Sequence, residues 1–266
     1  MKTPKTSWLR GLAVVFGVAV LFGLTAFGFY LFPATYSDWI LYLRPAALNP
    51  LNPYSSAIFN PPWLFIFLYP FAVLPERVGA AVLMAVTLLI IFIYEKVPWK
   101  ILLVAVSAPA LRLFTLGQLD GLVLLGLLIP AGLGLPILFF KPQNAFLAAL
   151  RRINPWSALV LGTTLIISWF IWGPWWSFLL QRGQSPVGWE HNISLFPWSI
   201  LPGIFFLWLG LKRHSDGMLC AASLCFTPYF MLSSTIVALA ALIRETSSKF
   251  LAAALVVSSW IILLAA

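Results

Sequence analysis

The sequence is poor in charged residues, cysteine and histidine. Only 9% of its 266 residues are charged, whereas a soluble domain carries about 25%. So few charges cannot cover a water-exposed surface, which excludes an ordinary soluble domain. Cys220 and Cys225 share one apolar stretch that contains no histidine, which argues against a disulfide framework and against a metal site.

Several sequence signatures are also absent. The chain has no Walker loop, no G-x-G-x-x-G, no H-E-x-x-H and no paired C-x-x-C. An enzyme with this sequence would therefore draw its energy from an activated substrate already in the membrane. A small-solute transporter is a further class that broken helices would suit. No repeat of fixed period is present, which disfavours this class because transporters are commonly built from internal repeats.

Apolar residues make up 62% of the chain, and the mean hydropathy is +0.98. Because a helix needs about 20 residues to cross the hydrocarbon core, the length allows about eight to eleven spans, several of them short. We expect an all-α polytopic transmembrane bundle that forms one integral membrane domain over residues 1–266. Twenty prolines and 17 glycines interrupt the apolar runs, and broken helices are tolerated where they line a cavity.

The net charge of +9 comes from cations that cluster at the ends of apolar runs. Lysine and arginine are typical of cytoplasmic loops, and no aromatic-and-basic groove for nucleic acid is visible. The first apolar run, Leu9–Phe32, is longer than the h-region of a signal peptide, and no A-x-A cleavage site follows it. We therefore expect an uncleaved first span with a cytoplasmic N-terminus.

Two polar segments, residues 33–57 and 177–197, separate the apolar runs. Within the first, we expect an interfacial helix over Tyr36–Leu48, with Ser37 as its N-cap and with Asp38 and Tyr42 on one side. The other runs are Ile58–Leu74, Val78–Tyr94, Ile101–Leu113, Leu119–Pro130, Pro136–Leu150, Ala158–Trp176, Trp198–Leu211, Met218–Ile243 (broken near Pro228) and Phe250–Ala266.

Strict alternation of these runs from a cytoplasmic N-terminus places Lys96 and Lys100 outside, against the positive-inside rule. One re-entrant run would remove the conflict, but the sequence does not identify it.

The seven acidic residues can be sorted by their neighbours. Four of them adjoin cations and are expected at the membrane interfaces, and Asp216 could also cap a helix: Glu76, Glu95, Asp216 and Glu245. Asp38, Asp120 and Glu190 remain. An aspartate near the bilayer should have a pKa raised by desolvation, which suits a general base. The alternatives are a solvated loop acid for Asp38, a helix-capping acid for Asp120 and an exposed loop for Glu190 with His191.

Lys141 is the most informative cation, because apolar sequence flanks it. A lysine at membrane depth costs about 2.5–3.5 kcal/mol on insertion scales, so it usually has a partner or a function. A phosphate oxygen is a suitable partner, whereas snorkelling to an interface is the alternative. Arg44 and Arg112 are further candidates for binding an anion.

Five short motifs, in this order, resemble those of glycosyltransferase family 87. They are Asp38-Trp39-Ile40-Leu41-Tyr42 with Asn52-Pro53-Tyr54 and Asn60-Pro61-Pro62, then Gly117-Gln118-Leu119-Asp120, Lys141-Pro142-Gln143, Asn192-Ile193-Ser194-Leu195 and Pro228-Tyr229. Members of this family are polyprenol-phosphate-mannose-dependent mannosyltransferases with the membrane-embedded GT-C fold. The chain departs from them in its shorter length and in Asp120, where asparagine is common.

The resemblance implies an inverting glycosyltransferase that moves mannose or a related hexose from a polyprenyl-phosphate donor to an acceptor hydroxyl, on a lipid or a glycan, outside the cytoplasm. Asp38 would be the catalytic base, and Lys141 with Arg44 would bind the lipid phosphate. The sugar or acceptor pocket would contain Tyr42, Tyr54, Gln118, Asp120, His191, Asn192 and Tyr229. A divalent metal is compatible with this reaction but is not required, and no other cofactor is expected.

A second interpretation is a protein that binds or translocates a lipid phosphate on the same scaffold without catalysis. It would need Lys141 but not Asp38. Both interpretations expect membrane lipids as partners and a multi-pass location, and the family's distribution favours a bacterial inner membrane.

Overall fold

The computed structural model describes residues 5–55, 58–182 and 191–265, and these residues form helices without any β-strand. The long helices are α1 (Lys5–Leu31), α4 (Glu76–Glu95), α10 (Pro155–Trp172), α12 (Ile200–Arg213) and α15 (Lys249–Ala265). The shorter helices are α2 (Arg44–Leu48), α3 (Trp63–Ala72), α5 (Pro98–Ala105), α6 (Ala108–Leu116), α7 (Asp120–Leu128), α8 (Ala131–Leu138), α9 (Pro142–Arg151), α11 (Trp175–Arg182), α13 (Asp216–Cys225) and α14 (Ile236–Glu245). The all-α prediction is confirmed for this part of the chain.

Three helices are long and apolar enough to cross a membrane: Val14–Leu31 within α1, all of α4, and all of α10. A fourth candidate is the pair α5 and α6, which bends by 62° at a short break. Fewer helices therefore reach spanning length in the described residues than the eight to eleven spans expected from composition. The reason is local, because proline and glycine divide the other apolar runs into short helices.

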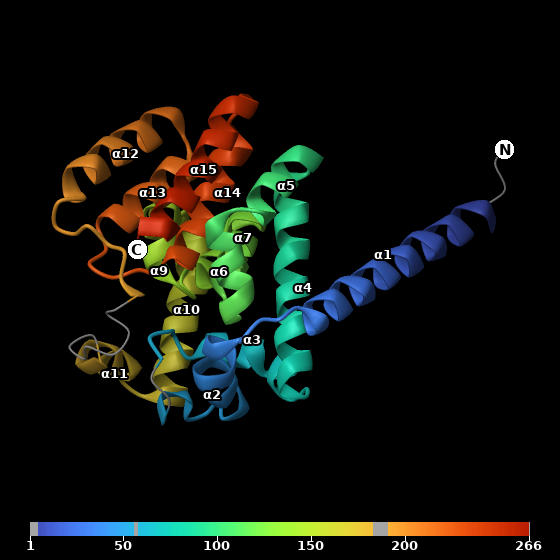
Figure 1. Ribbon diagram of the computed structural model, residues 1–266. Helices are drawn as coiled ribbons and strands as arrows, with labels where there is room; N and C mark the ends of the chain where they lie inside the picture. The colour runs from blue at the N-terminus through green and yellow to red at the C-terminus, as the bar shows by residue number, and fades with distance from the viewer. Residues whose placement is uncertain (1–4, 56–57, 183–190, 266) are drawn as a thin grey trace.

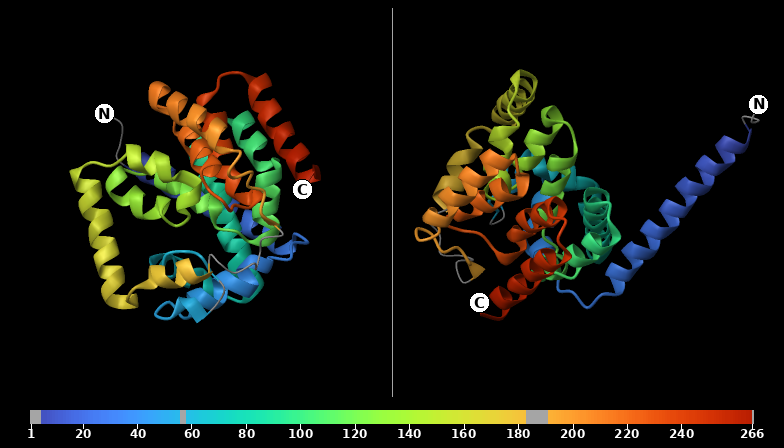
Figure 2. Two further views of the ribbon diagram at one scale, coloured as in Figure 1. Left: turned by 90° about the vertical axis from the view of Figure 1, so that its left-hand side faces the viewer. Right: turned by 90° about the horizontal axis from the view of Figure 1, so that it is seen from above.

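The body of the molecule lies against one side of α4, while α1 extends away from it (Figures 1 and 2). None of the Val14–Leu31 window is buried inside the protein, so the apolar side chains of α1 are available to lipid. The helices α2 and α3 lie near the N-terminal end of α4, and α5 lies at its C-terminal end (Figure 1). Because α4 has 20 residues and a helix rises about 1.5 Å per residue, its two ends are about 30 Å apart.

The core lies between α4, α7, α9, α13 and α14. Close packing of α7 on α4 depends on Gly121, because a Cβ atom there would stand 2.2 Å from Cγ2 of Thr87. The start of α7, with Asp120, is thereby held deep in the bundle.

The first polar segment contains the expected short helix. The chain is helical over residues 37–48, with a widened π-helical turn at Trp39–Leu43 that continues into α2. The prediction that Ser37 caps this helix is wrong. Ser37 lies inside its first turn, and its Oγ is 3.5 Å from Oδ1 of Asp38.

Candidate functional site

Buried aromatic residues fix the position of Asp38. Tyr36 is 1% exposed, its backbone N–H donates to the carbonyl oxygen of Thr115 (2.9 Å), and its hydroxyl donates to that of Phe29 (2.5 Å). Trp39 is fully buried, and its indole N–H donates to the carbonyl oxygen of Glu76 at 3.1 Å. Asp38 thus stands where the ends of α1 and α6 meet the start of α4.

A glycine brings the second motif against this segment. Gly117 ends α6 with a φ of +70°, a left-handed conformation that favours glycine. A Cβ atom at Gly117 would also lie 2.8 Å from Cβ of Trp39. The close approach that glycine permits places the next residue, Gln118, beside Asp38.

The Gln118 side chain joins Asp38 to Lys141. Its Nε2 donates a hydrogen bond to Oδ2 of Asp38, and its Oε1 accepts one from Nζ of Lys141 at 2.8 Å. The two partners fix the orientation of the amide, because only its nitrogen can donate and only its oxygen can accept. Three predicted residues from separate segments therefore form one continuous polar network.

Lys141 also pairs with Asp120. Its Nζ lies 2.9 Å from Oδ2 of Asp120, and the two side chains are 10% and 0% exposed. Asp120 lies in the first turn of α7, where the helix dipole favours a carboxylate. The pairing fits the expectation that a lysine surrounded by apolar sequence has a partner.

Asn144 belongs to this network, although our reading of the sequence did not select it. Its Nδ2 donates to Oδ1 of Asp120 at 2.7 Å, and the residue is fully buried. Its own Oδ1 has no hydrogen-bond partner among the described residues. The available signal was its position three residues after Lys141, in the first turn of the helix that Pro142 begins.

Burial raises the pKa of Asp38 above its ordinary value. The charge of Lys141 opposes this shift, Asp120 adds to it, and His191 and the Ser37 hydroxyl oppose it. A carboxylate with a raised pKa is a stronger base at neutral pH, and its half-buried position leaves it partly accessible. The electrostatic effect of His191 on Asp38 also relates the second polar segment to this site.

Asn192 connects the second polar segment to the Pro228-Tyr229 motif. Its Nδ2 donates to the carbonyl oxygen of Pro228 (3.0 Å), and its Oδ1 accepts from the backbone N–H of Phe230 (3.2 Å). The backbone N–H of Ile193 donates to the carbonyl oxygen of Phe230 at 3.1 Å. The side-chain amide of Asn192 therefore holds the second polar segment against the segment that contains Tyr229. Glu190 lies outside the described residues.

The two predicted tyrosines of the first polar segment have different surroundings. The hydroxyl of Tyr54 donates to the carbonyl oxygen of Asn60 (3.0 Å), and Nδ2 of Asn60 donates to that of Phe140 (2.9 Å). Tyr54 therefore supports the segment that leads into Lys141. Tyr42 is half-buried and packs on the apolar core.

Arg44 occupies a place apart from the Lys141 network. Its Nε donates to the carbonyl oxygen of Ala72 at 3.1 Å, and one terminal nitrogen lies 3.4 Å from that of Leu74. The other terminal nitrogen lies 3.8 Å from Oε2 of Glu76. The guanidinium thus fastens the short loop helix to the turn between α3 and α4.

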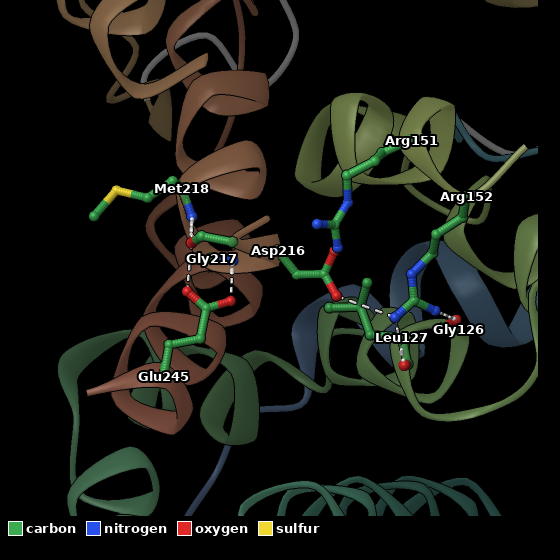
Figure 3. Close-up of polar contacts among 9 residues, drawn as sticks. Gly126, Leu127, Arg151, Arg152, Asp216, Gly217, Met218 and Glu245 are labelled. Atoms are coloured by element: carbon green, nitrogen blue, oxygen red, sulfur yellow. Dashed lines mark hydrogen bonds and ion pairs between the residues drawn. The ribbon is translucent and has the colours of Figure 1, made fainter. Parts of the chain in front are cut away.

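Two further acids hold helices together (Figure 3). Asp216 accepts from Arg151 at 2.5 Å and from Arg152 at 3.1 Å, and Arg152 also donates to the carbonyl oxygens at the end of α7. Ser215, rather than Asp216, caps α13. Glu245 accepts from the Ser215 hydroxyl and from the backbone N–H of Gly217 at 3.0 Å.

Glu95 differs from the interfacial position expected of it. The residue is 3% exposed, and neither carboxylate oxygen has a hydrogen-bond partner among the described residues. No group of three or more histidine, cysteine, aspartate or glutamate side chains that could hold a metal occurs in the described part of the chain.

In the described residues, fold and site together define an all-helical protein with several helices of membrane-spanning character. A polar network links its first polar segment, through Asp38, to the bundle core. Comparisons with protein-family models, curated proteins and solved structures returned no match.

Proposed function

We propose that the chain is a GT-C-type glycosyltransferase that uses a polyprenyl-phosphate-linked mannose or related hexose as its donor. The contact of Asp38 with Gln118, and of Gln118 with Lys141, carries this proposal. These residues come from three of the motifs that resemble family 87. The two contacts join residues that are 80 and 23 positions apart in sequence. Asp38, with its raised pKa, and Lys141, joined to it through Gln118, would supply a base and a cation for this reaction.

In the proposed reaction, Asp38 takes the proton from an acceptor hydroxyl while the oxygen of that hydroxyl attacks the anomeric carbon of the sugar. The bond from that carbon to the phosphate oxygen breaks, and the lipid phosphate leaves with the bonding electrons. Lys141 stabilises the negative charge that develops on the departing lipid phosphate. Electrostatic stabilisation of this kind is often the largest contribution to catalysis. Attack from the face opposite the leaving group inverts the sugar carbon.

The positions of the cations support a cytoplasmic N-terminus. With 10 residues, α3 is too short to cross a bilayer, which takes about 20. If α1 leads outward and α4 leads back, Lys96 and Lys100 lie on the cytoplasmic side, as the positive-inside rule requires. Nζ of Lys100 donates to the carbonyl oxygen of Arg244 at 2.7 Å, so a further cation lies on the same side. The α3 segment is then the run that does not cross, and Asp38 faces outward.

The experiment that tests this function measures transfer of radiolabelled sugar from polyprenyl-phosphate-mannose in membranes. We expect the Asp38→Asn variant to lose activity by about 10²–10⁴-fold, the usual contribution of a positioned base. Asparagine keeps an oxygen that can accept the hydrogen bond from Gln118, so folding should persist.

Glu76→Gln is the matched control, because this acid lies near the same loop with its side chain 48% exposed, and it should keep activity. Full activity of Asp38→Asn would contradict the base assignment. A folded wild type that transfers no sugar from several donors would favour the non-catalytic lipid-phosphate-binding alternative.

A further inference from the structure

The charges of the buried network leave an anionic substrate incompletely matched. Asp38 and Asp120 contribute two negative charges, and Lys141 contributes one positive charge. Gln118 and Asn144 are neutral, so this part of the site is negative overall when both acids are ionised. A phosphate brought beside it would be repelled by the uncompensated carboxylate. Binding a lipid phosphate here therefore requires another cation.

Two arginines near the start of α4 are already engaged. Arg44 donates to the carbonyl oxygens of Ala72 and Leu74. Arg77 donates to those of Tyr30 at 3.0 Å and Phe32 at 2.9 Å. Each of these guanidinium groups joins separate stretches of chain, so neither is free to take a substrate without loss of those contacts.

Arg112 remains. It lies in α6, the second half of the bent pair that forms the fourth candidate span. The residue is half-buried, and its guanidinium makes no hydrogen bond or ion pair with the described residues. A charged side chain in a membrane-spanning segment is costly and usually marks a functional position. Its five N–H donors form a planar fork that matches the oxygens of a phosphate group.

The helix that carries Arg112 also supports the catalytic segment. Thr115 follows Arg112 by three residues, so the two lie on one face of α6. The carbonyl oxygen of Thr115 accepts from the backbone N–H of Tyr36 at 2.9 Å and from the Thr35 hydroxyl at 3.3 Å. Arg112 is therefore about one helical turn from the point where α6 contacts the chain just before Asp38.

We propose that Arg112 binds the phosphate of the lipid-linked donor and so supplies the cation that the buried network lacks. This assignment rests on the proposed function, because it takes the donor from it. Half-burial on a candidate spanning element lets the guanidinium meet a headgroup that enters from the bilayer.

The test measures binding without turnover. Purified protein in zwitterionic nanodiscs is titrated with radiolabelled polyprenyl phosphate that carries no sugar. We expect Arg112→Gln to weaken binding by about ten- to a hundredfold, the range for losing hydrogen bonds to a charged group. Arg112→Lys, which keeps the charge but loses the fork, should fall between that variant and the wild type. Arg213→Gln removes an exposed arginine at the end of α12 and should bind as the wild type does.

Competitors identify the source of the phosphate. Inorganic phosphate should compete weakly, and the neutral polyprenol and the anionic phospholipid phosphatidylglycerol should not compete at equal concentration. Wild-type affinity in a folded Arg112→Gln protein would overturn the proposal, as would equal competition by phosphatidylglycerol or absence of binding by the wild type. If Arg112→Gln fails to fold, the Arg112→Lys affinity decides in the same way.

The outcome is separable from that of the transfer assay. Binding that depends on Arg112 in a protein that transfers no sugar would support this assignment and contradict the proposed enzyme. Transfer that depends on Asp38, with binding indifferent to Arg112, would support the enzyme and contradict the assignment.

Discussion

Replacing Lys141 by methionine should destabilise the protein strongly, because Asp120 would remain as a fully buried charge without its partner. The two charged atoms are 2.9 Å apart. At an effective permittivity of about 20, their attraction is about 6 kcal/mol. Desolvation of both groups offsets much of this attraction, and removal of one member of a buried pair typically costs about 3–5 kcal/mol.

Thermal unfolding in detergent can measure this cost. For a chain of this size, a loss of about 3–5 kcal/mol corresponds to a fall of about 6–20 °C in Tm. Asp120→Asn keeps an oxygen that can accept the hydrogen bond from Asn144. The double variant with Lys141→Met and Asp120→Asn should therefore be more stable than Lys141→Met alone.

A double-mutant cycle tests the reasoning directly, because contacting charged residues usually couple by about 0.5–3 kcal/mol. If Lys141→Met lowers Tm by less than about 2 °C, which is about 1 kcal/mol or less, the pair does not contribute as argued. Additive effects of the two substitutions would refute the coupling between them.

The pH dependence and the tight glycine contacts give two more predictions. Transfer should fall as pH decreases through the raised pKa of Asp38, since the base must be ionised. Lys141 lowers the pKa of Asp38 and Asp120 raises it, so Lys141→Gln should move the acid limb of the profile to higher pH and Asp120→Asn should move it to lower pH. If the kcat/KM profiles of the two variants shift in the same direction as each other, this account is contradicted. Gly79→Ala should cost about 1–3 kcal/mol by overpacking, because its Cβ atom would lie 2.3 Å from a backbone oxygen of α3. Gly162→Ala in α10, where nothing lies within 4 Å, should have no such cost, and equal Tm changes for the two variants would refute the packing argument.

The long apolar elements were predictable from the sequence because their signal is local. The expected runs over residues 9–32 and 78–94 correspond to α1 and α4, and the break near Pro228 separates α13 from α14. The run over residues 58–74 is different, because Pro61 and Pro62 delay the helix and α3 covers only 10 residues. Apolar composition alone does not show how much of a run becomes helical.

The candidate site was predictable only in part. Gln118, Asp120 and Lys141 were selected from their motifs, and the structure joins them to Asp38. Asn144 was missed, because an amide gains its role only from a partner 24 residues away. The contacts of residue 44 with the turn before α4 are equally long-range, so no local pattern distinguishes a structural arginine from one that binds a ligand.

The sequence order of the buried ion pair bears on how the protein is made. Asp120 is synthesised 21 residues before Lys141, so it reaches the membrane before its countercharge. Asp120 is fully buried in the first turn of α7, and burying an aspartate without its countercharge is strongly disfavoured. We therefore expect α7 to wait at the insertion machinery until α9 has emerged, so that this part of the chain enters the bilayer as one assembled unit.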